Sequence, residues 1–310
     1  MVPRADIAPV GKKKVRLAQH FYCKNIQKVY ICAINMSSGT VRAWITEQAR
    51  HGRTSFTRAE LCAAFPGVSG ARLGVELYRA CRSRLAAVAW QGFYLILPPE
   101  YQAVGMLPPA DYIDKLMAYM GKPYCVALLN AAAHYGAAHQ RPMNFTVMTS
   151  QPLPRSTVKR VNRIDFVSKS EMQNGIPAAL VRRVKTQYGS MVVSSPEFTA
   201  CTLVQYAKAA GGLAHVVSVL QELVEACDFS RLPSELAAYV PAPCLQRLGY
   251  ILERVLGERT AARGLHRHLL SICPRLRKTR LVPQLPSAHG GTDDKWGILI
   301  NQKLTTENDD

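Results

Sequence analysis

The sequence predicts an α+β protein on three observations. Apolar residues recur at helical spacing in three short segments before residue 86, and a strand-turn-strand pattern follows them. Helix-like and strand-like segments then alternate from residue 111. A largely helical region begins near residue 213, and a last strand pattern lies close to the C-terminus. A chain of 310 residues has room for two or three domains of ordinary size.

The chain is strongly basic. It has 39 Lys and Arg against 21 Asp and Glu, which gives a formal net charge of +18. Such a surface attracts polyanions, and we expect nucleic acid, although acidic proteins and anionic membranes also fit the charge alone. No uncharged apolar stretch is long enough to predict a transmembrane helix. Nine cysteines without a CxxC pair predict reduced thiols and a cytoplasmic location.

Residues 1–35 differ from the rest of the chain. They contain seven Lys or Arg and one acid, Asp6, without clear periodicity. Met36 opens "MSSGTVRAW", which is typical of a natural start in front of a helix. We therefore expect translation to begin at Met36, with residues 1–35 forming a basic extension that is not native.

Two short helices are predicted next. In "VRAWITEQARH", residues 41–51, apolar residues lie at helical spacing and Gly52 follows as a stop signal. In "SFTRAELCAAFPG", Thr57 and Glu60 form a capping-box pattern, and Pro66-Gly67 ends the segment.

A third helix and a hairpin follow. Residues 69–85 begin with Ser69 as a cap and place a leucine stripe opposite several arginines. Residues 88–97, "VAWQGFYLIL", form two apolar runs around Gln91-Gly92, as in a tight hairpin.

Three short helices followed by a hairpin predict a winged helix-turn-helix domain over residues 36–100. In this fold the third helix enters the major groove, and the hairpin wing touches the flanking DNA backbone. Alternatively, the basic helix is a solvated face and the hairpin covers the core. The residues we expect to bind DNA are arginines, four on the third helix and two near the second: Arg72, Arg79, Arg82, Arg84, Arg53 and Arg58.

A mixed α/β domain is predicted after the linker at 98–110. Residues 111–121 have the pattern of a helix, and "ALLNAAAHYGAA", residues 127–138, reads as a helix of small residues. Strand patterns follow at 143–149 and 163–169.

The rest of the chain is predicted to be mainly helical. A strand through Met191 to Val193 precedes a helix with Ser195 as its cap and Pro196 in its first turn. Helical periodicity dominates from 213 to about 270. "KWGILINQK", residues 295–303, predicts a final strand, and the tail after it is polar and frayed.

Catalytic motifs are missing from the sequence. No phosphate-binding glycine loop, HExxH or GxSxG motif is present. His134 and His139 are five residues apart, so on a helix they point in different directions and do not share a metal. A nuclease site built from Asp165, Lys169 and Glu171 is disfavoured, because Glu171 lies beyond the predicted strand. We expect no catalytic residues, no metal and no cofactor.

Several blocks carry a resemblance to a known family. They are "YCVALLNAAAHYGAAHQRPMNFTVMT", "RIDFVSK", "GIPAALVRRVKTQYGSMVVSSPEFTACTLVQY" and "AGGLAHVVSVLQEL", in this order. They resemble the antitoxin domain of the AbiEi family over residues 101–225. "LQRLGYILE" and "KWGILIN" in residues 226–310 resemble its C-terminal portion, and residues 36–100 lie where that family has its DNA-binding domain.

The resemblance implies an antitoxin of a type IV toxin-antitoxin system, active in abortive infection as a phage defence. It implies that the protein represses its own operon by binding inverted repeats, neutralises a nucleotidyltransferase-like toxin directly or indirectly, and is not an enzyme. The alternative is a winged-helix regulator with a partner- or ligand-sensing domain and no toxin. The chain departs from the family pattern at Cys201-Thr202, where relatives have a small residue and an aspartate.

A second basic cluster is predicted in the antitoxin-like domain. It extends the DNA contact or faces an acidic toxin surface, with a solvated face as the alternative. Its members are Arg155, Lys159, Arg160, Arg163, Lys169, Arg182, Arg183 and Lys185.

Overall fold

The structure, a computed structural model, describes residues 40–137, 142–155, 157–159, 162–286 and 290–305. The predicted N-terminal extension, His139, Arg160 and most of the polar tail lie outside these residues. The chain divides into two compact units, Met1–Gly105 and Met106–Asp310, called unit 1 and unit 2 below.

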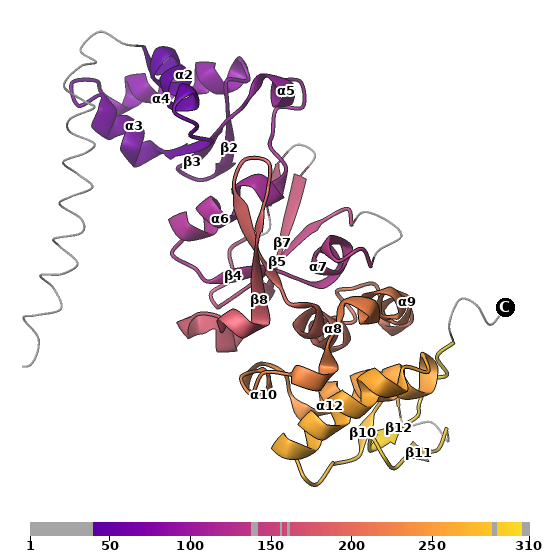
Figure 1. The fold of residues 1–310 in the computed structure, drawn as a ribbon. Helices are drawn as coiled ribbons and strands as arrows, with labels where there is room; N and C mark the ends of the chain where they lie inside the picture. Colours follow the sequence, from indigo (N-terminus) through magenta and orange to yellow (C-terminus); the bar gives the residue numbers. More distant parts are fainter. Residues whose placement is uncertain (1–39, 138–141, 156, 160–161, 287–289, 306–310) are drawn as a thin grey trace, which may run out of the picture. The chain divides into compact units, whose positions relative to one another are not determined.

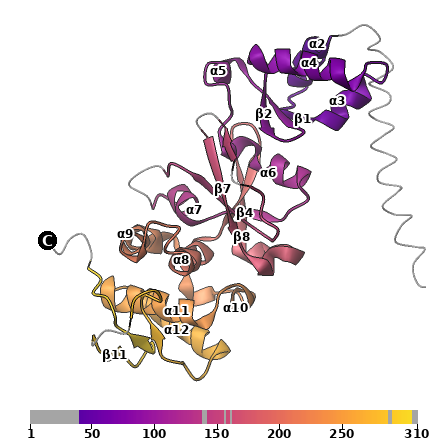
Figure 2. The same cartoon turned by 180° about the vertical axis from the view of Figure 1, so that it is seen from behind.

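The described part of unit 1 contains short helices and a small sheet (Figures 1 and 2). In chain order its elements are α2 Val41–Arg50, β1 Ser55–Thr57, α3 Arg58–Ala64, α4 Gly70–Arg82, β2 Ala86–Trp90, β3 Phe93–Ile96 and α5 Pro99–Gln102. The three predicted helices and the hairpin are confirmed. The strand β1 and the helix α5 were not predicted.

Side-chain caps explain where these helices begin. Thr57 Oγ1 accepts a hydrogen bond from the Glu60 amide at 3.1 Å, and the Glu60 carboxylate accepts one from the Thr57 amide at 2.7 Å. The predicted capping box is therefore confirmed. Ser69 caps α4 by accepting from the Arg72 amide at 3.4 Å. Such caps satisfy amide groups that have no partner within the helix.

The sheet of unit 1 has the strand order β1-β3-β2 and is antiparallel. Gly92, with φ +76°, makes the turn between β2 and β3. Phe56 on β1 stacks on Tyr94 with ring centroids 5.4 Å apart, and Trp44 of α2 meets Phe56 edge-on at 5.3 Å. These buried rings join α2 to the sheet.

A mixed sheet forms the centre of unit 2. Within its described residues the strands are β4 Tyr124–Val126, β5 Phe145–Thr149, β6 Thr157–Lys159, β7 Asn162–Ser168, β8 Val181–Lys185 and β9 Ser190–Ser194. Their order across the sheet is β6-β7-β5-β4-β9-β8. The β6–β7 and β8–β9 hairpins thus lie at opposite edges.

The stretch 123–137 begins with a strand that was not predicted, and the helix predicted over 127–138 is confirmed but is shorter. Tyr124–Val126 forms β4, which pairs with β5 and β9, and only Leu128–His134 is helical, as α7. Long-range strand pairing thus decides the conformation of a short apolar run that sequence periodicity cannot assign. Gly136, with φ +84°, ends α7.

Helices cover both faces of this sheet. Arg183 on β8 contacts Asp114 of α6 Pro109–Tyr119, whereas Arg182 lies over the ring of Tyr135, which ends α7. Successive strand residues point to opposite faces, so α6 and α7 lie on opposite sides. Helix α8 Pro196–Gln205 packs on α7, and α9 Leu213–Leu223 packs on α8. The predicted cap Ser195 accepts a hydrogen bond from the Phe198 amide.

The C-terminal part of unit 2 is mainly helical, as predicted. Its longer helices are α11 Ala242–Tyr250, continued by a π-helical turn at Ile251–Val255, and α12 Arg259–Ile272. The predicted last strand is confirmed as β12 Ile298–Leu299, the middle of a small sheet with β10 Thr279–Arg280 and β11 Thr292–Asp293. Shorter turns lie at Ser170–Asn174, Ala178–Leu180, Val224–Ala226, Phe229–Arg231 and, as α10, Leu236–Tyr239.

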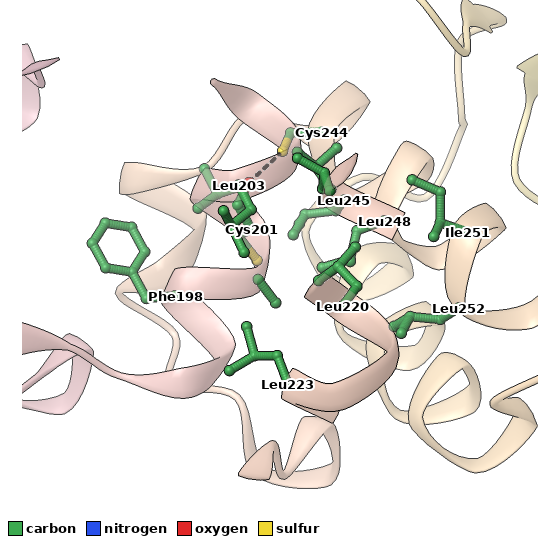
Figure 3. Close-up of a cluster of buried hydrophobic side chains, with 14 of the residues drawn as sticks. Phe198, Cys201, Leu203, Leu220, Leu223, Cys244, Leu245, Leu248, Ile251 and Leu252 are labelled. Carbon is green, nitrogen blue, oxygen red and sulfur yellow. Dashed lines mark hydrogen bonds between the residues drawn. The ribbon is translucent and has the colours of Figure 1, made fainter. Parts of the chain in front are cut away.

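Helices α8, α9 and α11 share one hydrophobic core (Figure 3). The thiol of Cys244 donates to the carbonyl of Cys201 at 3.1 Å, which links α11 to α8. Burial raises the pKa of the Cys244 thiol to about 12, so both the thiol and its hydrogen bond persist at neutral pH. The hydroxyl of Thr202 is buried and donates a hydrogen bond to the Thr199 carbonyl at 3.1 Å, so this buried polar group has a partner.

Candidate nucleic-acid interface

Helix α4 has one buried face and one exposed basic face. Leu73, Leu77 and Ala80 are buried against unit 1. The exposed residues recur every three or four positions, so they share the opposite face of the helix. That face, called the α4 outer face below, carries Arg72, Val75, Tyr78, Arg79 and Arg82.

Two arginines of the α4 outer face keep their hydrogen-bond donors available. Arg79 pairs with Glu76 one turn away, with 2.8 Å between nitrogen and oxygen. Arg72 and Arg82 are exposed, and among the described residues neither pairs with a carboxylate. A guanidinium group presents five donors in a planar fork, which suits phosphate oxygens and guanine edges.

Arg53 and Arg84 are engaged inside unit 1. Arg53 donates to Gln48 at 2.9 Å and pairs with Glu60. Arg84 does not lie on the third helix, which corrects the prediction: α4 ends at Arg82, and Arg84 follows it in the left-handed region with φ +57°. Its guanidinium donates to the carbonyls of Gln102 and Ala103.

Arg58 lies between two helices. It is the first residue of α3, and its guanidinium donates to the carbonyl of Gly70 in the first turn of α4 at 3.2 Å. It therefore contributes to the angle between α3 and α4. Its side chain is nevertheless exposed.

The β2–β3 hairpin is uncharged. Residues 86–97 contain no Lys or Arg, and Gln91 and Gly92 form the tip. A hairpin of this composition offers backbone amides and a glutamine side chain, but no positive charge, to a polyanion. The exposed arginines nearest to the hairpin in sequence are Arg79 and Arg82 of α4, and Arg84, which follows α4.

The second basic cluster is divided by the sheet of unit 2, which corrects the prediction of one cluster. Arg163 lies on β7, next to the edge strand β6, which contains Lys159, whereas Arg182 and Lys185 lie on the opposite edge strand β8. Four strand spacings separate β7 from β8, about 19 Å. Residues that are near in sequence thus belong to two distant edges.

The two edges are also unlike in their contacts. Arg163 pairs with Asp165 on the same face of β7 at 2.9 Å. Arg183 pairs with Asp114 at 2.9 Å, and this carboxylate raises the pKa of Arg183. Arg155 and Lys185 are exposed. Arginines already paired with acids add less net charge to a polyanion site.

Lys169 is buried, which corrects its assignment to an exposed patch. Its side chain is 1 % exposed, and Nζ donates to Gln205 Oε1 at 3.0 Å. The Glu171 carboxylate lies 3.9 Å from Nζ, and the ring of Tyr206 lies 5.9 Å away. Burial lowers the pKa of Lys169, which the nearby Glu171 opposes. This lysine links the end of β7 to α8.

A further basic surface was not predicted. On α12, Arg259, Arg263 and Arg267 are exposed and follow each other at four-residue spacing. Residues 259–280 contain seven Lys or Arg and no Asp or Glu. The repeated arginine spacing and the absence of acids were signals for this surface in the sequence.

The stretch with two histidines does not form a site within the described residues. His134 ends α7 and is exposed, and its ring meets Tyr135 edge-on at 5.2 Å. Burial of part of the ring, and then the charge of Arg182, lower the pKa of His134. Among the residues that the structure describes, no three His, Cys, Asp or Glu are placed to hold a metal ion.

The fold and these surfaces define a basic α+β protein of two units, in which a mixed sheet with helices on both faces follows a small helical unit. Residues 124–254 of the second unit match the model of the AbiEi antitoxin C-terminal domain. The resemblance to the AbiEi antitoxin family, predicted from the sequence blocks, is therefore confirmed by the match over residues 124–254.

One solved structure supports the fold over most of the chain. The RV2827C protein from Mycobacterium tuberculosis is similar with a TM-score of 0.56, at 14 % sequence identity, over 82 % of this chain and 88 % of that chain. At this identity the likeness concerns the fold alone. No curated protein matches the chain. In its described part, the chain has no helix with the length and apolar character needed to cross a membrane.

Proposed function

We propose that this protein is the antitoxin of a type IV toxin-antitoxin system and the repressor of its own operon. Unit 1 binds inverted repeats in the promoter as a winged helix-turn-helix domain, with α4 in the major groove. Unit 2 neutralises a nucleotidyltransferase-like toxin, and the family match over residues 124–254 supports this part of the proposal. The single observation that carries DNA binding is the α4 outer face.

The order of elements in unit 1 supports this role for α4. Helices α2, α3 and α4 precede the β2–β3 hairpin, as in winged helix-turn-helix domains, in which the third helix reads DNA. The major groove is about 12 Å wide and admits one α-helix. Arg72 and Arg82 lie near opposite ends of α4, so with α4 in the groove each can reach the phosphates or guanine edges next to its own end of the helix.

DNA binding is tested on the promoter fragment by fluorescence anisotropy at several salt concentrations. The double variant Arg72→Ala, Arg82→Ala is expected to lower the affinity for DNA. It should also reduce the magnitude of the slope of log K against log salt by about 0.9 for each of the one or two phosphate contacts that are lost. Arg231→Ala, an exposed arginine in unit 2, is the control. Equal affinity and slope for the double variant and the wild type would refute the assignment of α4.

Toxin neutralisation is tested by growth. The reading frame downstream of this gene is expressed from an inducible promoter, alone and with the full chain. Growth arrest that the full chain relieves is expected, and the Arg72→Ala, Arg82→Ala variant should relieve it equally, because neutralisation resides in unit 2. A harmless neighbour, together with intact promoter binding, would instead identify a DNA-binding regulator without a cognate toxin.

A further inference from the structure

The α4 outer face is not uniformly charged. Val75 and Tyr78 are 50 % and 62 % exposed, although both are large apolar side chains. They lie one turn apart between the exposed Arg72 and Arg82. Their burial is not needed to attach the helix, since Leu73, Leu77 and Ala80 do so from the opposite face.

Scattered apolar residues are normal on a protein surface, so exposure alone says little. The position of Val75 and Tyr78 is more specific. Both lie in the middle of the α4 outer face, between Arg72 and Arg82 and beside Arg79, which is paired with Glu76. If the helix bound only the DNA backbone, phosphate-binding residues would be expected at these two positions. A valine offers nothing to a phosphate oxygen, because it has no hydrogen-bond donor and no charge.

The major groove contains one apolar group that these residues fit. Each thymine presents its C5-methyl group there, next to base-edge donors and acceptors, and small apolar or aromatic side chains contact it. Val75 and Tyr78 are separated by about 4.5 Å along the helix axis, which is comparable to the rise of about 3.4 Å per base pair, so the two side chains can reach neighbouring base pairs.

We infer that Val75 and Tyr78 determine sequence specificity by packing against thymine C5-methyl groups in the middle of each DNA half-site, while the flanking arginines bind phosphates or guanines. This inference rests on the proposed DNA-binding function and specifies that α4 prefers thymine at these positions. A protein surface that docks on the same face is the competing occupant, and the experiment below distinguishes the two.

The test uses the full chain and DNA of two origins, the promoter fragment and sequences selected from a random duplex pool. Each thymine of the bound site is replaced in turn by deoxyuridine, which removes the methyl group and keeps the base pair. At one or two neighbouring positions of each half-site, the affinity is expected to fall by about threefold to tenfold.

Variants then assign the contact to side chains. Val75→Ala should bind the unmodified thymine site as weakly as the wild type binds the deoxyuridine site, and deoxyuridine should cause it no further loss of affinity. Tyr78→Ala should behave in the same way at the adjacent position. Val104→Ala, a valine of unit 1 that is 47 % exposed and lies off α4, should retain the full sensitivity. Far-UV circular dichroism checks that each variant is folded.

Three results would overturn the inference. Sequence-specific binding without deoxyuridine sensitivity at any position would leave the proposed function standing and remove the thymine contact. Unchanged DNA affinity of Val75→Ala and Tyr78→Ala, with loss of toxin rescue or a change in oligomeric state, would identify a protein-docking face. If the full chain binds neither DNA source, the proposed DNA-binding function fails together with the inference.

Discussion

The carboxylate of Glu253 accepts a hydrogen bond from the indole nitrogen of Trp296 at 2.7 Å. The same carboxylate accepts one from Lys295 Nζ at 2.6 Å. Glu253 lies in the π-helical turn after α11, within the family-matched region, whereas Trp296 lies 42 residues beyond the end of that match. The C-terminal segment is thus anchored to the matched part of unit 2 through a fully buried tryptophan.

Gly249 makes room for this tryptophan. A Cβ atom at position 249 would lie 2.0 Å from Trp296 Cζ3, so Gly249→Ala must displace the ring or the helix. We expect the variant to lose about 1–3 kcal/mol of the free energy of unfolding, measured by urea titration. Gly67→Ala is the control, because a Cβ there meets nothing within 4 Å. Equal urea midpoints for the two variants would contradict the close packing.

The stability of unit 2 should depend on the charge of Glu253. Burial alone would raise the pKa of this carboxyl group, but the hydrogen bonds from Lys295 and Trp296 outweigh it, and the pKa is lowered. A carboxyl group with a lower pKa in the folded state stabilises the protein above its unfolded pKa, near 4.5, and this contribution is lost as the pH falls through the folded pKa.

Urea midpoints of wild type and Glu253→Gln between pH 7 and pH 3 measure this effect. The wild type should exceed the variant most at pH 6–7, and the difference should shrink below pH 4. Glu235→Gln, at an exposed glutamate, is the control. A difference that is constant over the whole range would show that the charge of Glu253 contributes nothing.

The capping box stabilises unit 1 locally. Thr57→Ala removes the acceptor for the Glu60 amide and leaves that amide without its side-chain partner. We expect a loss of about 1 kcal/mol in the free energy of unfolding of unit 1, measured by urea titration. Thr46→Ala is the matched control, since its hydroxyl donates to a carbonyl within its own helix at 3.0 Å. An equal effect of both substitutions would argue against the cap.

Lys169 should take no part in DNA binding. Its ammonium group is buried and bound to Gln205, so it cannot release counterions from a duplex. Lys169→Met is expected to leave the slope of log K against log salt unchanged, in the anisotropy titration described above. For comparison, Arg155→Ala changes an exposed member of the predicted basic cluster and shows in the same titration whether that residue contacts DNA. A smaller slope for Lys169→Met would show that this side chain is accessible in the complex.

Local signals in the sequence accounted for much of unit 1. The caps at Thr57 and Ser69, the turn at Gly92 and the arginine face of α4 all depend on residues within four positions of one another. The strand β1 was missed because its three residues are too few to show a period of two. It exists because it pairs with β3, which is far along the chain.

The sequence by itself therefore determined where α3 and α4 begin, the hairpin, the basic character and the family blocks. Only the tertiary structure decided that the basic cluster of unit 2 is divided between two sheet edges and that Lys169 is buried. It also decided that the ring of Trp296 packs against the backbone of Gly249. The physical reason is the range of the interactions. Caps and turns are hydrogen bonds between near neighbours, whereas strand order and burial depend on contacts between distant segments, which leave no periodic trace in the sequence.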